Sequence, residues 1–345
     1  MFIFEEIDYS EWKLNFKKCQ NNNMLQCWQY GAAKEETGNW LPVRFLVKDE
    51  IGEVVGLIQF LTRKFPLIGR VARMNRGPIL IEDVKTGTSE TLVINIISAL
   101  LKEFNKRRWR IVQIAPEINN SVKVHQALLN IGLHKLSQIP YASGLIDLRK
   151  NEQQLLMGLK KKWRYCLRKS LQSDLNINVS SGDNLELKTL LDKYTKLQER
   201  KDFSGIPNSL ISSLAQQVAE EWDFVLFVAK NNDSSNLEDC LGMLVIIMHG
   251  DTATYLIGLT NNKGRCLNVN YALLWHAMLH AKSSGTKWFD IGGLDESTPD
   301  GIAHFKRGLN SSLYSLVGEW RYYSLPRIPI ILNNRFKASK DSNVS

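Results

Sequence analysis

The chain has 345 residues, of which 44% are hydrophobic, and carries a formal charge of +9. This length suffices for two domains with their own cores, and no apolar run approaches the roughly 20 residues of a spanning helix. The opening segment is acidic where a secretory signal would be basic, so we expect a cytoplasmic protein. The positive charge favours a polyanionic or phosphorylated partner.

The first half of the chain contains three consecutive β-branched segments separated by turn residues, which is typical of strands. A helical pattern and a fourth strand follow. In chain order we expect strands Val43–Lys48, Glu53–Thr62 and Arg70–Leu80, helix Glu90–Arg107 and strand Trp109–Ile114.

The second half repeats this order of elements. We expect strands Asp223–Lys230, Cys240–Met248 and Ala253–Thr260, helix Asn270–Ser283 and strand Thr286–Ile291. An antiparallel meander that leads into a helix and a further strand is the core order of the acetyltransferase-like (GNAT) fold. The repeat therefore predicts an α+β protein with two tandem GNAT-like domains, each a mixed, mainly antiparallel sheet flanked by helices. The first domain is expected over residues 1–147, the second over 148–310, and a disordered tail over 337–345.

A basic helix is expected between the two halves. Asn151 and Gln154 have the spacing of a capping box, and an apolar face continues to Leu167. Lys161, Arg164 and Arg168 follow at i, i+3 and i+7 on the other face, a stripe that could hold a diphosphate or could simply be solvated. A second helix is expected from about Asp183 to Asp202.

The most informative motif lies near the C-terminus. Phe289-Asp290-Ile291-Gly292-Gly293 is a strand that runs into a glycine pair, and Phe305-Lys306 follows in a helix-like segment before Val317-Gly318. Glycines let the backbone approach a ligand closely. Together with Trp28–Lys34, Trp40–Arg44 and Asn75–Pro78, this pattern resembles the Fem-type family, aminoacyltransferases that use aminoacyl-tRNA to build peptide bridges on cell-wall precursors.

The resemblance implies roles for particular residues. Lys34, Arg164 and Tyr194 match positions that hold the diphosphate of a nucleotide-linked sugar-peptide, with Lys161 and Arg168 beside them. It also implies that a returning segment, residues 311–330, completes the first domain. The match of Phe305-Lys306 points to a catalytic pair beside Gly292 and Gly293, in which Lys306 would stabilise an oxyanion.

A general base is not singled out by the sequence. Asp290, Asp295 and Glu296 are the nearby carboxylates that could accept a proton from the attacking amine. Some relatives carry an acidic residue before the Pro-Glu at the end of the first domain's last strand, but Ala115 occupies that position here.

Several cofactor signals are missing from the sequence. Neither G-x-x-x-x-G-K-[ST] nor G-x-G-x-x-G occurs, and the segment Asn262–Asn268 lacks the spacing of a coenzyme A diphosphate loop. Five scattered cysteines and the His276/His280 pair do not form a metal motif. We therefore expect no cofactor and no metal.

These observations lead to one main hypothesis and two alternatives. The main hypothesis is an aminoacyltransferase that moves an aminoacyl group from aminoacyl-tRNA to an amine of a nucleotide- or lipid-linked muropeptide or a similar acceptor, with peripheral contact to a membrane-bound precursor. The alternatives are an acyl-CoA-dependent N-acyltransferase acting on a polysaccharide or lipid precursor, and a non-catalytic RNA-binding protein.

Overall fold

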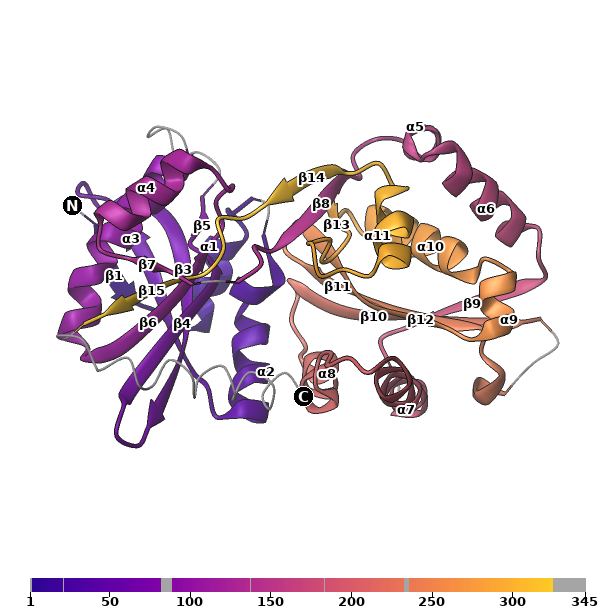
Figure 1. The fold of residues 1–345 in the computed structure, drawn as a ribbon, viewed down its shortest axis with the longest axis horizontal. Coiled ribbons are helices and arrows are strands. Elements are labelled where there is room, and N and C mark those ends of the chain that lie inside the picture. Colours follow the sequence, from indigo (N-terminus) through magenta and orange to yellow (C-terminus); the bar gives the residue numbers. More distant parts are fainter. Residues whose placement is uncertain are drawn as a thin grey trace. The chain divides into compact units, whose positions relative to one another are not determined.

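The computed structural model describes residues 2–20, 22–81, 89–136, 138–182, 184–232 and 236–324. These residues form two compact units (Figure 1). The first unit comprises the residues up to Ala142 and the segment that begins at Tyr314, and the second comprises Ser143–Leu313. Each unit is built on one β-sheet. The tail expected at 337–345 lies outside the described residues.

The sheet of the first unit has the strand order β1-β2-β3-β4-β6-β15-β7, with β5 paired to β3. Only β4 and β6 pair in parallel among its described pairs. Ile96, Ile97 and Leu100 of helix α3 are buried in the hydrophobic core that packs against this sheet. The strands are β1 Ile3–Glu6, β2 Leu41–Lys48, β3 Val54–Phe65, β4 Gly69–Gly77, β5 Ile79–Leu80, β6 Trp109–Pro116, β7 His134–Lys135 and β15 Trp320–Tyr323; the helices are α1 Tyr9–Phe16, η1 Met24–Gln26, α2 Trp28–Gly38, α3 Ser89–Lys106 and α4 Val122–Asn130.

The sheet of the second unit has the order β14-β8-β13-β12-β11-β10-β9. Strands β12 and β13 are parallel, which is the same arrangement that β4 and β6 have in the first sheet. The strands are β8 Ala142–Asp147, β9 Leu175–Ser180, β10 Trp222–Asn231, β11 Gly242–His249, β12 Thr252–Thr260, β13 Trp288–Asp290 and β14 Ser312–Ser315; the helices are α5 Glu152–Gly158, α6 Lys161–Leu171, α7 Asn184–Lys201, α8 Asn208–Gln216, η2 Leu237–Asp239, α9 Asn262–Cys266, α10 Val269–Ser283 and α11 Asp300–Arg307.

The repeated order of elements predicted from the sequence is present in both units. In each, three antiparallel strands lead into a long helix, and the strand after the helix pairs in parallel with the third of them. The predicted fold class, a mixed α/β protein with two such sheets, is therefore confirmed.

The boundary between the units differs by one strand from the predicted one. Strand β8, which the sequence prediction assigned to the first domain, pairs with β13 and belongs to the second unit. At the other end of the chain, β15 lies between β6 and β7 of the first sheet.

The basic connector was expected to be one helix but forms two. The capping box of Asn151 and Gln154 starts α5 as predicted. At Leu159 and Lys160 the backbone is extended, with ψ of 148° and 149°, so the chain restarts as α6. Leu159 is buried at this break, which lets both short helices cover the core of the second unit.

Candidate functional site

A buried carboxylate shapes the turn that follows β13. Asp290 accepts hydrogen bonds from Gly292 N at 2.9 Å and from Ser143 Oγ of β8 at 2.5 Å. Gly292 has φ of 71°, a conformation that favours glycine, and an added Cβ would lie 2.6 Å from the Tyr255 carbonyl oxygen. The glycine at 292 is thus required both by its backbone angle and by the close approach of β12.

Lys306 extends from α11 to this same turn. Its side chain is buried, and Nζ donates to the carbonyl oxygen of Gly293 at 2.8 Å. The ammonium also lies 5.2 Å from the centroid of the Tyr255 ring. Burial lowers the pKa of Lys306 to about 8, and the charges of Asp290 and Asp295 offset part of this effect. The glycine turn thus holds a buried cation through its own carbonyl group.

Phe305, the neighbour of Lys306, belongs to an aromatic cluster with Trp163 and Tyr271. Its ring centroid is 5.0 Å from that of Tyr271, nearly perpendicular to it, and 5.9 Å from that of Trp163. Edge-to-face packing of this kind fixes the ring positions. Phe305 therefore connects α11 to both α6 and α10.

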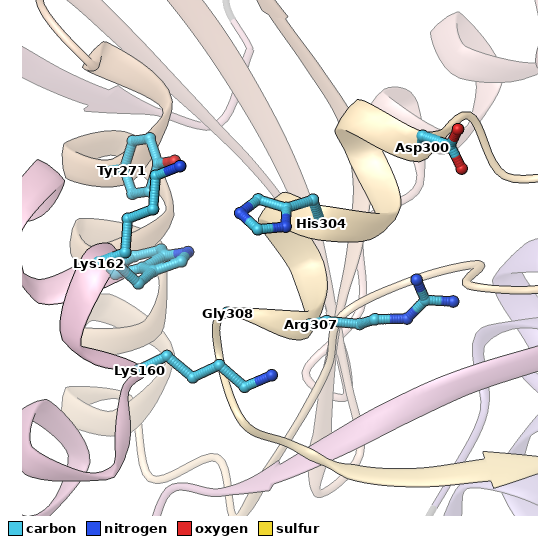
Figure 2. A pocket seen from close by; sticks show the side chains of 8 residues that line it. Lys160, Lys162, Tyr271, Asp300, His304, Arg307 and Gly308 are labelled. Carbon is cyan, nitrogen blue, oxygen red and sulfur yellow. The ribbon is translucent and has the colours of Figure 1, made fainter.

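Two cavities adjoin the aromatic cluster, and Tyr271 lines both. The first, of about 360 Å³, is lined by residues of α6, α10 and α11 (Figure 2). In Figure 2, Lys160 and Lys162 lie at the start of α6, and His304 and Arg307 lie on α11; His304 points toward Lys162 and Tyr271, and Arg307 extends away from them. The second cavity, of about 320 Å³, is lined by Tyr255, by Phe305 and by the residues that begin α10.

The first cavity is cationic. Within the part of the chain that the structure describes, Lys160, Lys162 and Arg307 form no ion pair, although Asp300 is also in the lining. Positively charged grooves bind the phosphates of nucleic acids. The arrangement suits an anionic ligand.

Among the described residues, neither Asp295 nor Glu296 forms a hydrogen bond with Lys306. Asp295 accepts from Ser297 N at 2.9 Å and Ser297 Oγ at 2.6 Å, so it stabilises its own turn. Glu296 is exposed. The base remains unassigned among the three carboxylates that the sequence suggested.

The predicted basic stripe lies on α6, with its members in different roles. Arg164 Nη1 donates to the carbonyl oxygens of Met157 (2.9 Å) and Leu159. These bonds satisfy carbonyls at the end of α5, where a helix lacks partners of its own. Lys161 and Arg168 are exposed. Arg164 therefore has a structural role in addition to any contact with a ligand.

Tyr194 is buried, with its hydroxyl inside the protein. The hydroxyl oxygen accepts a hydrogen bond from Ile206 N at 3.1 Å, and burial raises the pKa of Tyr194. The hydroxyl is therefore directed into the protein and not into solvent.

Lys34 lies in the first unit, on α2, whereas Arg164 and Tyr194 lie in the second. Burial lowers the pKa of Lys34, and the charge of Arg73 lowers it further. Arg73 itself is paired with Glu319 at 2.8 Å. Among the described residues Lys34 has no ion pair, so an anion bound here would gain a half-buried cation with a second cation nearby.

Residues that the sequence did not reveal complete the site. Ser143 and Tyr255 come from distant strands, and no local pattern marks either of them. His304 and Arg307 flank the Phe305-Lys306 pair and could have been found from helical spacing once α11 was recognised.

Within the described ranges, no group of three or more His, Cys, Asp or Glu side chains is arranged to hold a metal ion. The same residues contain no helix that is long and apolar enough to cross a membrane.

Comparison with known proteins gives one matching family model, that of the FemAB family, over residues 186–328. Lipid II:glycine glycyltransferase of Staphylococcus haemolyticus is 29% identical over 149 residues, 40% of this chain and 34% of that protein. The chain thus matches only about a third of the length of that relative. The enzyme of the same name from Staphylococcus aureus is 21% identical across 89% of both chains.

Solved structures extend the likeness to almost the whole fold. A crystal structure of FemX has a TM-score of 0.76 at 20% identity, covering 93% of this chain and 97% of that one. A tandem GNAT protein from the clavulanic acid biosynthesis pathway has a TM-score of 0.57 at 10% identity, covering 95% and 100%. The predicted tandem GNAT-like fold is confirmed by both.

The turn geometry predicts a large effect of Gly292→Ala on stability. The substitution places a Cβ against the Tyr255 carbonyl at a positive φ, which should cost about 1–3 kcal/mol of unfolding free energy. Gly158→Ala is the control, since no heavy atom lies within 4 Å of its added Cβ. Urea denaturation of both variants checks this, and equal stabilities would contradict the proposed constraint.

Proposed function

We propose that the chain is a transferase of the Fem type and that it transfers an aminoacyl group from aminoacyl-tRNA to an amine of a peptidoglycan precursor. The single observation that carries this proposal is the buried Lys306 at the Gly292-Gly293 turn. The names of the two staphylococcal relatives support a lipid-linked acceptor.

In the proposed reaction, the acceptor nitrogen attacks the ester carbonyl carbon of the donor. A C–N bond forms, the ester C–O bond breaks, and the ribose hydroxyl leaves with a proton while the amine loses one. The negative charge that develops on the carbonyl oxygen is stabilised by the Lys306 ammonium, which uses one N–H for Gly293 and keeps two for the substrate.

The cationic cavity of Lys160, Lys162 and Arg307 is proposed to hold the nucleotide end of the donor. Positively charged grooves bind the nucleic-acid backbone without requiring a particular sequence. Phe305 contacts Trp163 and Tyr271, which line this cavity, and Lys306 is its neighbour in α11. Binding of the nucleotide in the cavity would therefore also fix the position of Lys306.

The donor is tested by incubating the protein and an amine acceptor with labelled aminoacyl-tRNA or with labelled acetyl-CoA. Transfer from aminoacyl-tRNA alone is expected. Transfer from acetyl-CoA would favour an acyl-CoA-dependent enzyme, and the absence of transfer from either would leave an RNA-binding protein.

Lys306→Met should lower the single-turnover rate about 100- to 1000-fold with little change in apparent affinity, because the lost interaction forms in the transition state. The assay uses charged tRNA and saturating acceptor, and Lys102→Met, an exposed lysine on α3, is the control. Full activity of Lys306→Met would refute the catalytic role, and a loss of affinity alone would make Lys306 a binding residue.

The rate should also depend on pH through Lys306. Its pKa of about 8 means that the stabilising cation is present at lower pH and is lost as the pH rises through about 8. Asp290→Asn removes a charge that raises this pKa, so the fall in single-turnover rate should move to lower pH. In Lys306→Arg the guanidinium stays charged, so this fall should be absent. Identical profiles in all three proteins would contradict the assignment.

Lys34 is proposed to bind the acceptor diphosphate. Lys34→Met should weaken acceptor binding by roughly 1.5–3 kcal/mol while leaving tRNA binding nearly intact, because a charge-assisted hydrogen bond is lost. Arg164→Met should lower the melting temperature, since Arg164 caps α5. Calorimetric titration of Lys34→Met with a nucleotide-linked muropeptide measures the affinity, and an unchanged value would reject the assignment of Lys34.

A further inference from the structure

The hairpin of β3 and β4 extends past its neighbours in the first sheet. Pairing of β3 with β2 ends at Thr62, and pairing of β4 with β6 begins at Arg70. Between these points, β3 and β4 pair only with each other, up to the Phe65–Gly69 pair. Residues 63–69 therefore form a projecting tip, visible in Figure 1 as the end of the long β3–β4 hairpin.

The stability of the fold does not explain why a leucine occupies position 67 at this tip. Its side chain is fully exposed, and its backbone is left-handed with φ of 66°. Glycine or asparagine adopts this conformation at lower cost, and an exposed leucine gains nothing from burial in the fold. Pro66 is also exposed, and Phe65 and Ile68 are half-buried, so the apex of the tip, residues 65–68, is apolar.

The base of the tip carries several positive charges, and their mutual repulsion destabilises the hairpin. Lys64 and Arg70 lie directly opposite each other in the strand register, and like charges in that position repel. Arg63 and Arg110 are also at this end, the latter with its Cγ 2.8 Å from the position of a Cβ on Gly69. In the sequence, no acidic residue occurs between Glu53 and Glu82.

We propose that this tip inserts into the headgroup region of an anionic lipid bilayer. Leu67, Pro66 and Ile68 would enter the boundary between headgroups and acyl chains, while Lys64, Arg70 and Arg63 would face the lipid phosphates. Membrane binding would offset both unfavourable features. The exposed Leu67 would be buried in lipid, and the opposed cations Lys64 and Arg70 would contact negatively charged headgroups. This inference rests on the hairpin alone and goes beyond the proposed transfer reaction.

A lipid surface fits the tip better than RNA does. The exposed residues of the apex, Pro66 and Leu67, are not aromatic, and the ring of Phe65 is already packed against Trp40 and Arg63. Single-stranded RNA is instead bound by accessible aromatic side chains in cationic grooves. The described residues contain no spanning helix, and a shallow contact of this kind does not need one. If the acceptor is lipid-linked, the contact would also bring the protein to its substrate.

The test is flotation of the full-length protein with phosphatidylcholine vesicles that contain or lack phosphatidylglycerol. Binding to the anionic vesicles and weaker binding to the neutral ones are expected. Leu67→Asn should reduce binding about tenfold, because it removes the inserted side chain but suits the left-handed backbone. Val122→Asn, at an exposed position on α4, is the matched control and should bind like the unaltered protein.

A Lys64→Gln variant separates charge from insertion and should weaken binding to anionic vesicles about fivefold while leaving binding to neutral vesicles unchanged. Melting curves should show that Leu67→Asn is at least as stable as the unaltered protein. The proposal is overturned if anionic vesicles do not bind the protein, if Leu67→Asn and Val122→Asn bind equally, or if an RNA oligonucleotide is bound through Leu67 instead.

Discussion

Asp290 is the group on which the arrangement around Lys306 depends. Its carboxylate holds Gly292 N and Ser143 Oγ, and so joins β8, β13 and the glycine turn. The same negative charge opposes the effect of burial on the pKa of Lys306. One buried side chain thus determines both where the turn carbonyl of Gly293 lies and how readily the lysine that binds it stays protonated. Removing the carboxylate would leave buried donors without an acceptor, which is costly in a protein interior.

Helix α11 connects this turn to the cavities. Asp300, His304, Arg307 and Gly308 line the first cavity, Gly301, Ile302 and Phe305 line the second, and Lys306 contacts the turn. Because successive residues of a helix point about 100° apart, the side chains of one short helix can contact both cavities and the glycine turn. The ring of Phe305 against Trp163 and Tyr271 fixes the rotation of α11, and through it the direction of Lys306.

Local sequence signals predicted those features whose causes are local. The capping box of Asn151 and Gln154 formed as expected because both partners lie within one helical turn. The end of that helix was missed, since the extended backbone at Leu159 is favoured by burial against the core and by the bonds from Arg164 to the carbonyls of Met157 and Leu159. Similarly, β8 was assigned to the wrong side of the domain boundary because its partner, β13, lies over 140 residues away in sequence.

By itself, the sequence determined the repeated order of strands and helices, since periodicity and turn residues act over short distances. It also marked Gly292, Gly293 and Lys306 through one motif. Only the tertiary structure decided which carboxylate meets Gly292, that Tyr194 turns its hydroxyl inward to Ile206, and that Ser143 and Tyr255 enter the site. Those contacts join residues far apart in the chain, and their geometry comes from strand register and core packing, which no local pattern encodes.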